Sequence, residues 1–241
     1  MSIALECKKM KRTGFYPAFI VGGVLASCLP VLNMTVRSEV YTSLSQPPVQ
    51  ILLNANWSMM AMLNILLIIS GACILYHTEY ADNAVQKMHT LPIRESGMFF
   101  AKYILMTGMS IAALAIEAIT VALCSLHWFE QTSGLYLDLL KNFIYFLILT
   151  LPSILLSLFI SSACKNMWIS LGVGVVCVFI ANIIISTDKF ILLIFPFALP
   201  FQILAGTPAD KVMQFLIASV VEIVVIGIAM LSFLRIKRSF T

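Results

Sequence analysis

The side chains that could do chemistry gather in one polar stretch, Tyr76 to Tyr103. Glu79 and Asp82 lie about one helical turn apart, a spacing that could pair two carboxylates for acid and base catalysis. Basic residues lie nearby, and the motifs H-E-x-x-H and G-x-S-x-G and a phosphate-binding loop are absent from the sequence. We therefore interpret the stretch as a solvated or partner-binding face, and expect no enzyme activity in this chain.

Metal and disulfide chemistry find little support in the sequence. His77 and His89 share the polar stretch, whereas His127 is expected at the opposite membrane face. The six cysteines form no C-x-x-C pair, and five of them lie in or beside apolar runs. This pattern predicts buried free thiols, and we expect this chain to bind no metal and no cofactor.

Two acidic residues, Glu117 and Glu222, lie inside apolar runs. An ionisable group within a membrane span is costly and is a functional candidate by default. At about 1.5 Å per residue, Glu117 lies roughly 28 Å from Met98, toward the outer face. Both acids are candidates for contact with a cationic substrate. They could equally bond neighbouring helices or be protonated.

The elements that position these residues follow from the composition. The 241 residues are 61% hydrophobic and only 11% charged, whereas a soluble domain carries about 25% charged residues. A bilayer is the solvent that fits such a chain, and its length holds about six spans of roughly 20 residues. We predict an all-α membrane protein with a single transmembrane domain, 1–241, and no room for a separate ATP-binding domain.

The hydropathy pattern divides this domain into segments. We expect an amphipathic entry helix at 1–14, a cytoplasmic helix at 79–93, and an apolar segment at 190–206 that is too short to span. Pro196 and Pro200 interrupt that segment, which favours a re-entrant or interfacial path. The six predicted spans are 15–35, 51–76, 98–126, 139–163, 167–186 and 211–234.

Individual residues in the spans carry further expectations. Trp57 and Trp168 stand near span ends, as interfacial tryptophans do. Asn64 and Ser70 can form hydrogen bonds across helices. Pro152 predicts a kink, at which the freed backbone carbonyl finds another partner. Gly172 and Gly174 predict a close approach between helices.

The basic residues predict the orientation. With the N-terminus inside, eleven of the 15 Lys and Arg residues fall on the cytoplasmic side. Only Arg37, Lys141, Lys189 and Lys211 fall outside. This bias predicts that both termini and the polar stretch are cytoplasmic. The modest net charge of +4 then reflects membrane topology, and we expect no nucleic-acid partner.

The polar stretch has the composition of a short helix with a defined end. Glu79 to His89 contains neither Gly nor Pro, and Pro92 disfavours helical backbone at Leu91. Such a helix between two spans is suited to transmit force from a docked partner. A plain connecting loop is the alternative.

This order of residues resembles the permeases of type-2 ABC exporters, the ABC-2 type. Glu79, a short helix, Thr90-Leu91-Pro92-Ile93-Arg94 and then Lys102 match that family's coupling helix and the lysine that opens its third span. The family also has a basic entry helix, six spans, cytoplasmic termini and a re-entrant hairpin between spans five and six. Each has a counterpart among the predicted segments.

The resemblance implies several partners. It implies a separate ATPase dimer, which would carry ATP and Mg²⁺, a second and different permease subunit, and membrane lipid. The ATPase would contact the residues of the expected coupling helix: Glu79, Asp82, Asn83, Lys87, Met88, Thr90, Leu91, Pro92, Ile93 and Arg94.

Within the family, the small size and the entry Lys11-Arg12-Thr13 look most like the permease subunits of lantibiotic immunity exporters. Glu79-Tyr80-Ala81-Asp82 departs from the Gly-Thr often found at the start of the coupling segment in broader type-2 permeases. The expected function is removal of a cationic antimicrobial peptide from a bacterial plasma membrane. The alternatives are export of a small drug, lipid or polysaccharide by the same machinery, and a non-ABC scaffold or secondary transporter, which would favour inverted repeats.

Overall fold

The chain folds as a bundle of long helices. The computed structural model describes residues 3–80, 95–129, 134–164, 166–185 and 189–239, and these contain no strand. Six helices are long and apolar enough to cross a membrane. They are α2 (Phe15–Thr42), α3 (Pro48–Tyr80), α5 (Glu95–Trp128), α6 (Leu135–Ala163), α7 (Met167–Ile185) and α9 (Ala209–Ser239). The prediction of an all-α membrane protein with six spans is confirmed.

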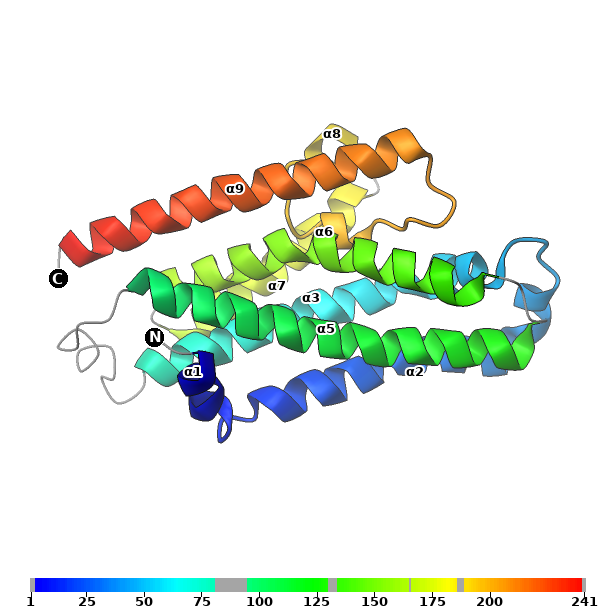
Figure 1. Ribbon diagram of the computed structural model, residues 1–241, viewed down its shortest axis with the longest axis horizontal. Helices are drawn as coiled ribbons and strands as arrows, with labels where there is room; N and C mark the ends of the chain where they lie inside the picture. Colours follow the sequence, from blue (N-terminus) through cyan, green and yellow to red (C-terminus); the bar gives the residue numbers. More distant parts are fainter. Residues whose placement is uncertain (1–2, 81–94, 130–133, 165, 186–188, 240–241) are drawn as a thin grey trace.

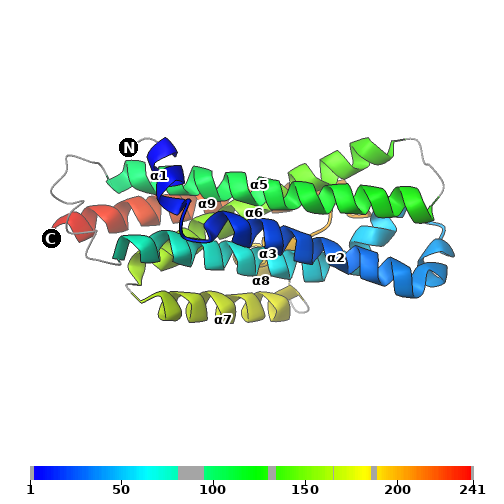
Figure 2. The same ribbon diagram turned by 90° about the horizontal axis from the view of Figure 1, so that it is seen from below.

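The six long helices run along one axis, and the short helix α1 (Ile3–Met10) crosses that axis steeply (Figures 1 and 2). Both chain ends lie at the same end of the bundle, which we call the terminal end (Figure 1). The opposite end is the distal end. An even number of spans requires this arrangement, so both termini lie on one side of the membrane. That this side is the cytoplasm stays a prediction.

The helices extend beyond the predicted spans. α2 is kinked at Arg37, whose backbone angles are non-helical, and it continues to Thr42. Helical structure therefore extends into the region predicted as an external loop. α3 continues to Tyr80, so the cytoplasmic helix expected at 79–93 does not begin at Glu79. Hydropathy marks only the depth of the hydrocarbon, whereas backbone hydrogen bonding can continue past it into the polar layers.

Two apolar clusters form the core. One packs Phe15, Phe19 and Tyr76 toward the terminal end, and the other contains Trp57 and Phe146. Trp57 is 1% exposed and its indole stacks on the Phe146 ring at 3.5 Å between centroids. The expectation that Trp57 lies in the interfacial belt is therefore wrong.

The segment between α7 and α9 packs against the bundle without crossing it. It contains only short helical elements within its described residues: α8 (Lys189–Leu192) and a 3₁₀ turn, η2 (Leu199–Phe201). Prolines in this segment interrupt a continuous helix. Side chains of α3 and α6 bind its backbone. Ser153 donates to the Pro196 carbonyl at 2.7 Å, Trp57 donates to the Pro200 carbonyl at 2.8 Å, and Asn142 accepts from the Ala205 N–H at 3.1 Å.

Pro152 lies inside α6, which remains continuous from Leu135 to Ala163. Proline has no N–H to donate to the carbonyl four residues earlier, that of Ile148. The hydroxyl of Ser219 on α9 donates to this carbonyl at 2.9 Å. The predicted second partner for the freed carbonyl is therefore confirmed, and it connects α9 to α6.

Gly174 brings α7 close to α3. A Cβ atom at Gly174 would lie 2.4 Å from a methyl group of Ile69, whereas one at Gly172 would meet nothing within 4 Å. The prediction of close helix approach is thus confirmed at Gly174. Gly172 faces away from its neighbours.

Candidate functional site

A buried ion pair joins the base of α3 to the base of α5. Lys102 Nζ lies 2.6 Å from Glu79 Oε1, and the lysine is 1% exposed. The same ammonium lies 4.9 Å from the centre of the Tyr76 ring. Two buried charges are costly to remove from water unless each neutralises the other at short range. This pair meets that condition.

The entry helix α1 joins the same cluster. Lys9 Nζ lies 2.9 Å from Glu6 Oε1 and 3.5 Å from Glu79 Oε1. Glu6, Lys9, Glu79 and Lys102 together, which we call the base cluster, carry two negative and two positive charges. The cluster therefore connects three helices at the terminal end while remaining neutral.

Apolar packing and a tight turn hold α1 in this position. Met10 and Phe15 are fully buried on either side of Gly14, whose φ of 76° is the left-handed conformation that glycine adopts most readily. Across the turn, the Tyr16 hydroxyl donates to the Cys7 carbonyl at 3.0 Å. The inward side of α1 is thereby fixed against α3 and α5.

These positions correct one part of the sequence interpretation. Glu79 is 6% exposed and its carboxylate faces Lys9 and Lys102, so it is not an outward docking residue. Its helix, α3, ends one residue later at Tyr80, directly before residues 81–94. The other predicted ATPase contacts lie outside the described residues and stay predictions: Asp82, Asn83, Lys87, Met88, Thr90, Leu91, Pro92, Ile93 and Arg94.

A second polar pair joins α3 and α5 deeper in the bundle. Asn64 Nδ2 donates to Glu117 Oε2 at 3.1 Å, and Glu117 is fully buried. The predicted cross-helix bond of Asn64 is confirmed. The one predicted for Ser70 is wrong, because its hydroxyl donates to the Leu66 carbonyl within the same helix.

The two pairs share one register. Fifteen residues separate Asn64 from Glu79 on α3, and fifteen separate Lys102 from Glu117 on α5. At about 1.5 Å per residue, the pairs lie roughly 22 Å apart along the helices. A slip of α3 along α5 by one turn would break both pairs, so these two helices form one unit, which we call the α3–α5 pair.

A small crevice lies beside Asn64, between α2, α3, α5 and α6. Its polar wall consists of Asn64, Ser110 and Thr150, and the rest is apolar. The Ser110 hydroxyl and Glu117 Oε1 are buried, and neither has a hydrogen-bond partner within the described part of the chain. The crevice is narrow and mostly apolar, and a peptide backbone would not fit between the helices without moving them.

Glu222 occupies a different helix interface. It is 7% exposed and follows Ser219 by one turn, on the side of α9 that faces α6. Neither of its carboxylate oxygens has a hydrogen-bond partner among the residues that the structure describes. Glu117 lies between α3 and α5, so the structure does not bring the two predicted substrate-contacting acids into one site.

Sequence reasoning missed the partners of Glu79 on α1. Lys9 was grouped with the other basic residues of the entry helix, although it turns inward. The signal was Glu6, the acid three residues before Lys9, since residues at this spacing lie on one face of a helix. In the described ranges no three His, Cys, Asp or Glu side chains are grouped to hold a metal, and all six cysteines are free thiols.

Comparison with known protein families gives one match. Residues 2–182 match a family described as ABC-2 family transporter protein. The matched part includes α1, the base cluster and both polar pairs of the α3–α5 pair, and it ends before α8. No curated protein and no solved structure matches the chain. Since the family match covers most of the chain and the six long helices are apolar, this multi-pass membrane protein belongs to the ABC-2 family of transporters.

Proposed function

We propose that the chain is the permease subunit of an ATP-driven exporter that removes a cationic antimicrobial peptide of the lantibiotic class from the bacterial plasma membrane. Family membership supports a membrane permease of an ABC exporter. The peptide substrate, and the immunity or resistance that its removal gives, form the finer part of the proposal.

The energy for transport comes from a separate ATPase dimer, which binds ATP and Mg²⁺ and docks on residues 82–94. The observation that carries this proposal is the buried Glu79–Lys102 pair at 2.6 Å. It joins the two helices that enter and leave that segment. When the ATPase moves the segment, the α3–α5 pair tilts as one unit, because Asn64 and Glu117 hold the same register deeper in the membrane.

The unpartnered acids support a cationic substrate. Glu222 and one oxygen of Glu117 are buried without hydrogen-bond partners in the described chain. An ionisable group buried in a span is a functional candidate by default, and a carboxylate can pair with a positively charged ligand. Both are buried at rest, so the peptide reaches them only when α9 or the α3–α5 pair moves outward. A second, different permease subunit completes the peptide's path.

A protection assay tests the substrate. The chain, its ATPase and its second permease are expressed together in a sensitive bacterium, and growth is measured against lantibiotic concentration. The expected result is higher tolerance, reduced by the variant Glu222→Gln. The control Glu39→Gln makes the same chemical change at an exposed site on α2 and leaves tolerance unchanged. Equal growth with and without the transporter would exclude the peptide as substrate.

Two further measurements separate the alternatives. Protection against neutral drugs, or an altered lipid or polysaccharide content, would assign another substrate to the same exporter. The double variant Asp82→Lys/Lys87→Glu should lower the amount of ATPase that copurifies, whereas Lys141→Glu, an exposed site near the start of α6, should not. A membrane scaffold or secondary transporter predicts no copurifying ATPase with any variant.

A further inference from the structure

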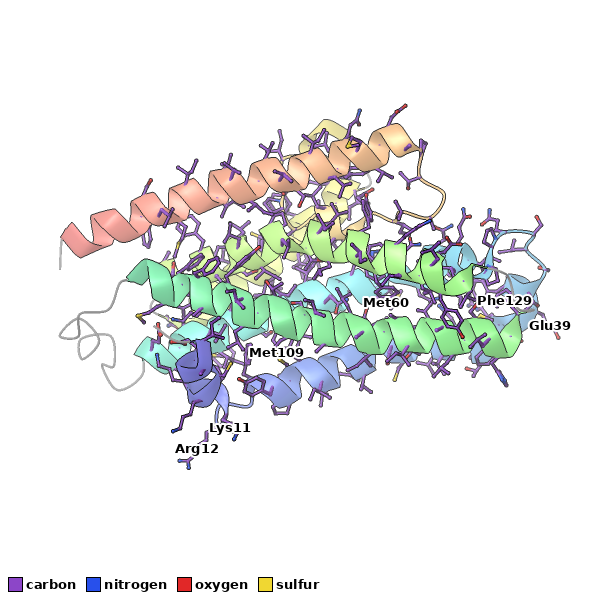
Figure 3. The ribbon with its side chains drawn as sticks, in the orientation of Figure 1. Lys11, Arg12, Glu39, Met60, Met109 and Phe129 are labelled. Atoms are coloured by element: carbon purple, nitrogen blue, oxygen red, sulfur yellow. The ribbon has the colours of Figure 1, made fainter. Side chains whose placement is uncertain are left out.

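The entry helix and the turn after it present opposite sides with different chemistry. Glu6, Lys9 and Met10 face the bundle, where Glu6 and Met10 are fully buried. Lys8, Lys11 and Arg12 are exposed. Figure 3 shows Lys11 and Arg12 pointing away from the helices. We call these three exposed residues the basic edge.

The acidic side chains that the structure describes at the terminal end, Glu6 and Glu79, do not offset the basic edge from outside. Glu6 is bonded to Lys9 and Glu79 to Lys102, and both carboxylates are buried. The exposed charges between Ile3 and Arg12 are therefore all positive. A local excess of three positive charges attracts an anionic surface.

The basic edge lies where the chain enters the membrane. α1 crosses the bundle axis and so lies along the plane of the bilayer surface (Figures 1 and 2). Phe15, the first residue of the apolar helix α2, follows Arg12 by three positions. A short helix in this plane beside a span places its basic side chains at the level of the lipid phosphates.

We propose that Lys8, Lys11 and Arg12 bind the phosphate headgroups of anionic phospholipids, and that this contact holds Lys9 against Glu79. The inference depends on the membrane location and not on the peptide substrate. Arg12 can bind a phosphate through two parallel N–H groups, and both lysines act as point charges. Each basic side chain near an anionic surface strengthens binding by about fivefold.

Native mass spectrometry of the detergent-purified chain tests the first part. The chain is titrated with phosphatidylglycerol and, separately, with phosphatidylcholine. The wild type should bind the anionic lipid more tightly, and the variant K8Q/K11Q/R12Q should lose about tenfold or more of that affinity. The matched control R37Q/K141Q/K211Q removes three exposed positive charges from the distal half and should keep the preference.

Equal binding of the two lipids by the wild type, or an unchanged preference in the triple variant, would overturn the proposal. So would an equal loss in the control, because it would show a response to total charge alone. Circular dichroism in lipid-free detergent checks that both triple variants remain folded. If K8Q/K11Q/R12Q does not fold, the three single variants K8Q, K11Q and R12Q are tested instead. Each should lose roughly fivefold in affinity for phosphatidylglycerol.

A fourth variant tests the connection to the base cluster. Lys9 faces inward, so Lys9→Gln should keep the preference for phosphatidylglycerol. Phosphatidylglycerol should raise the unfolding midpoint of the wild type and should raise that of Lys9→Gln by less. The reason is that α1 of the variant, although it binds the lipid, no longer forms an ion pair with Glu79. An undiminished rise would show that lipid binding does not act through Lys9.

Discussion

Lys102 Nζ and Glu79 Oε1 lie 2.6 Å apart and buried, although residues 81–94 separate the helices that carry them. In the proposed function, the ATPase moves residues 82–94, and these two helices flank that segment. A joint that ties both flanking helices prevents one from moving without the other. The proposed mechanism requires such a joint.

A double-mutant cycle on this pair measures the strength of the joint. Lys102→Gln and Glu79→Gln should each lower the free energy of unfolding by about 3–5 kcal/mol, because each leaves a buried charge without its closest partner. The double variant should lose much less than the sum. The measurement is unfolding by sodium dodecyl sulfate in mixed micelles. Lys141→Gln, at an exposed site, should change stability by less than about 0.5 kcal/mol. Additive losses would show that the two charges act independently.

Trp57 should be far more sensitive to substitution than Trp168. Trp57→Phe removes the donor to the buried Pro200 carbonyl and part of the stack on Phe146. The expected loss is about 1–3 kcal/mol in the free energy of unfolding. Trp168 is 75% exposed, so Trp168→Phe should have little effect in the same micelle assay. Equal effects would contradict a buried role for Trp57.

The bond between Ser219 and the Ile148 carbonyl should matter only while Pro152 is present. Ser219→Ala should cost about 1 kcal/mol, because it leaves that carbonyl without its donor. With Pro152→Ala as background, residue 152 regains an N–H for the same carbonyl. Ser219→Ala should then cost close to nothing. The measurement is the loss of unfolding free energy caused by Ser219→Ala, first with Pro152 present and then in the Pro152→Ala background. Equal losses would show that Ser219 does not stabilise the protein through the Ile148 carbonyl.

The two glycines of α7 provide an internal comparison. Gly174→Ala should destabilise the protein, because the new methyl group would lie 2.4 Å from Ile69. Gly172→Ala meets open space and should stabilise the helix by up to about 1 kcal/mol. Thermal unfolding midpoints in detergent should therefore move in opposite directions. Shifts of the same sign would contradict the close packing of α7 on α3.

The sequence predicted elements better than it predicted partners. Apolar runs identify spans because the hydrocarbon thickness sets their length, and all six were found at the right places. The helix ends differ from the predicted span ends, since α2 and α3 continue as helices through polar residues to Thr42 and Tyr80. Hydropathy carries no signal for a helix that continues into the polar layers.

The direction of individual side chains was harder to predict. Trp57 was interpreted as interfacial from its place near a span end, but a segment more than a hundred residues later covers it. Glu79 was interpreted as a docking residue, whereas Lys9 and Lys102 hold it inside. Such contacts depend on which distant helices become neighbours, and sequence spacing reports only the neighbours within one helix.

The hydrogen bond between Trp57 and Pro200 also has a consequence for biosynthesis. The two residues are 143 positions apart. When α3 leaves the ribosome, the carbonyl that its indole will bind has not yet been translated. The nascent helix must therefore enter the bilayer before its final partner exists, and water or lipid headgroups have to solvate the indole N–H until Pro200 is synthesised. Chains that stop before Pro200 should consequently be prime substrates for membrane quality-control proteases.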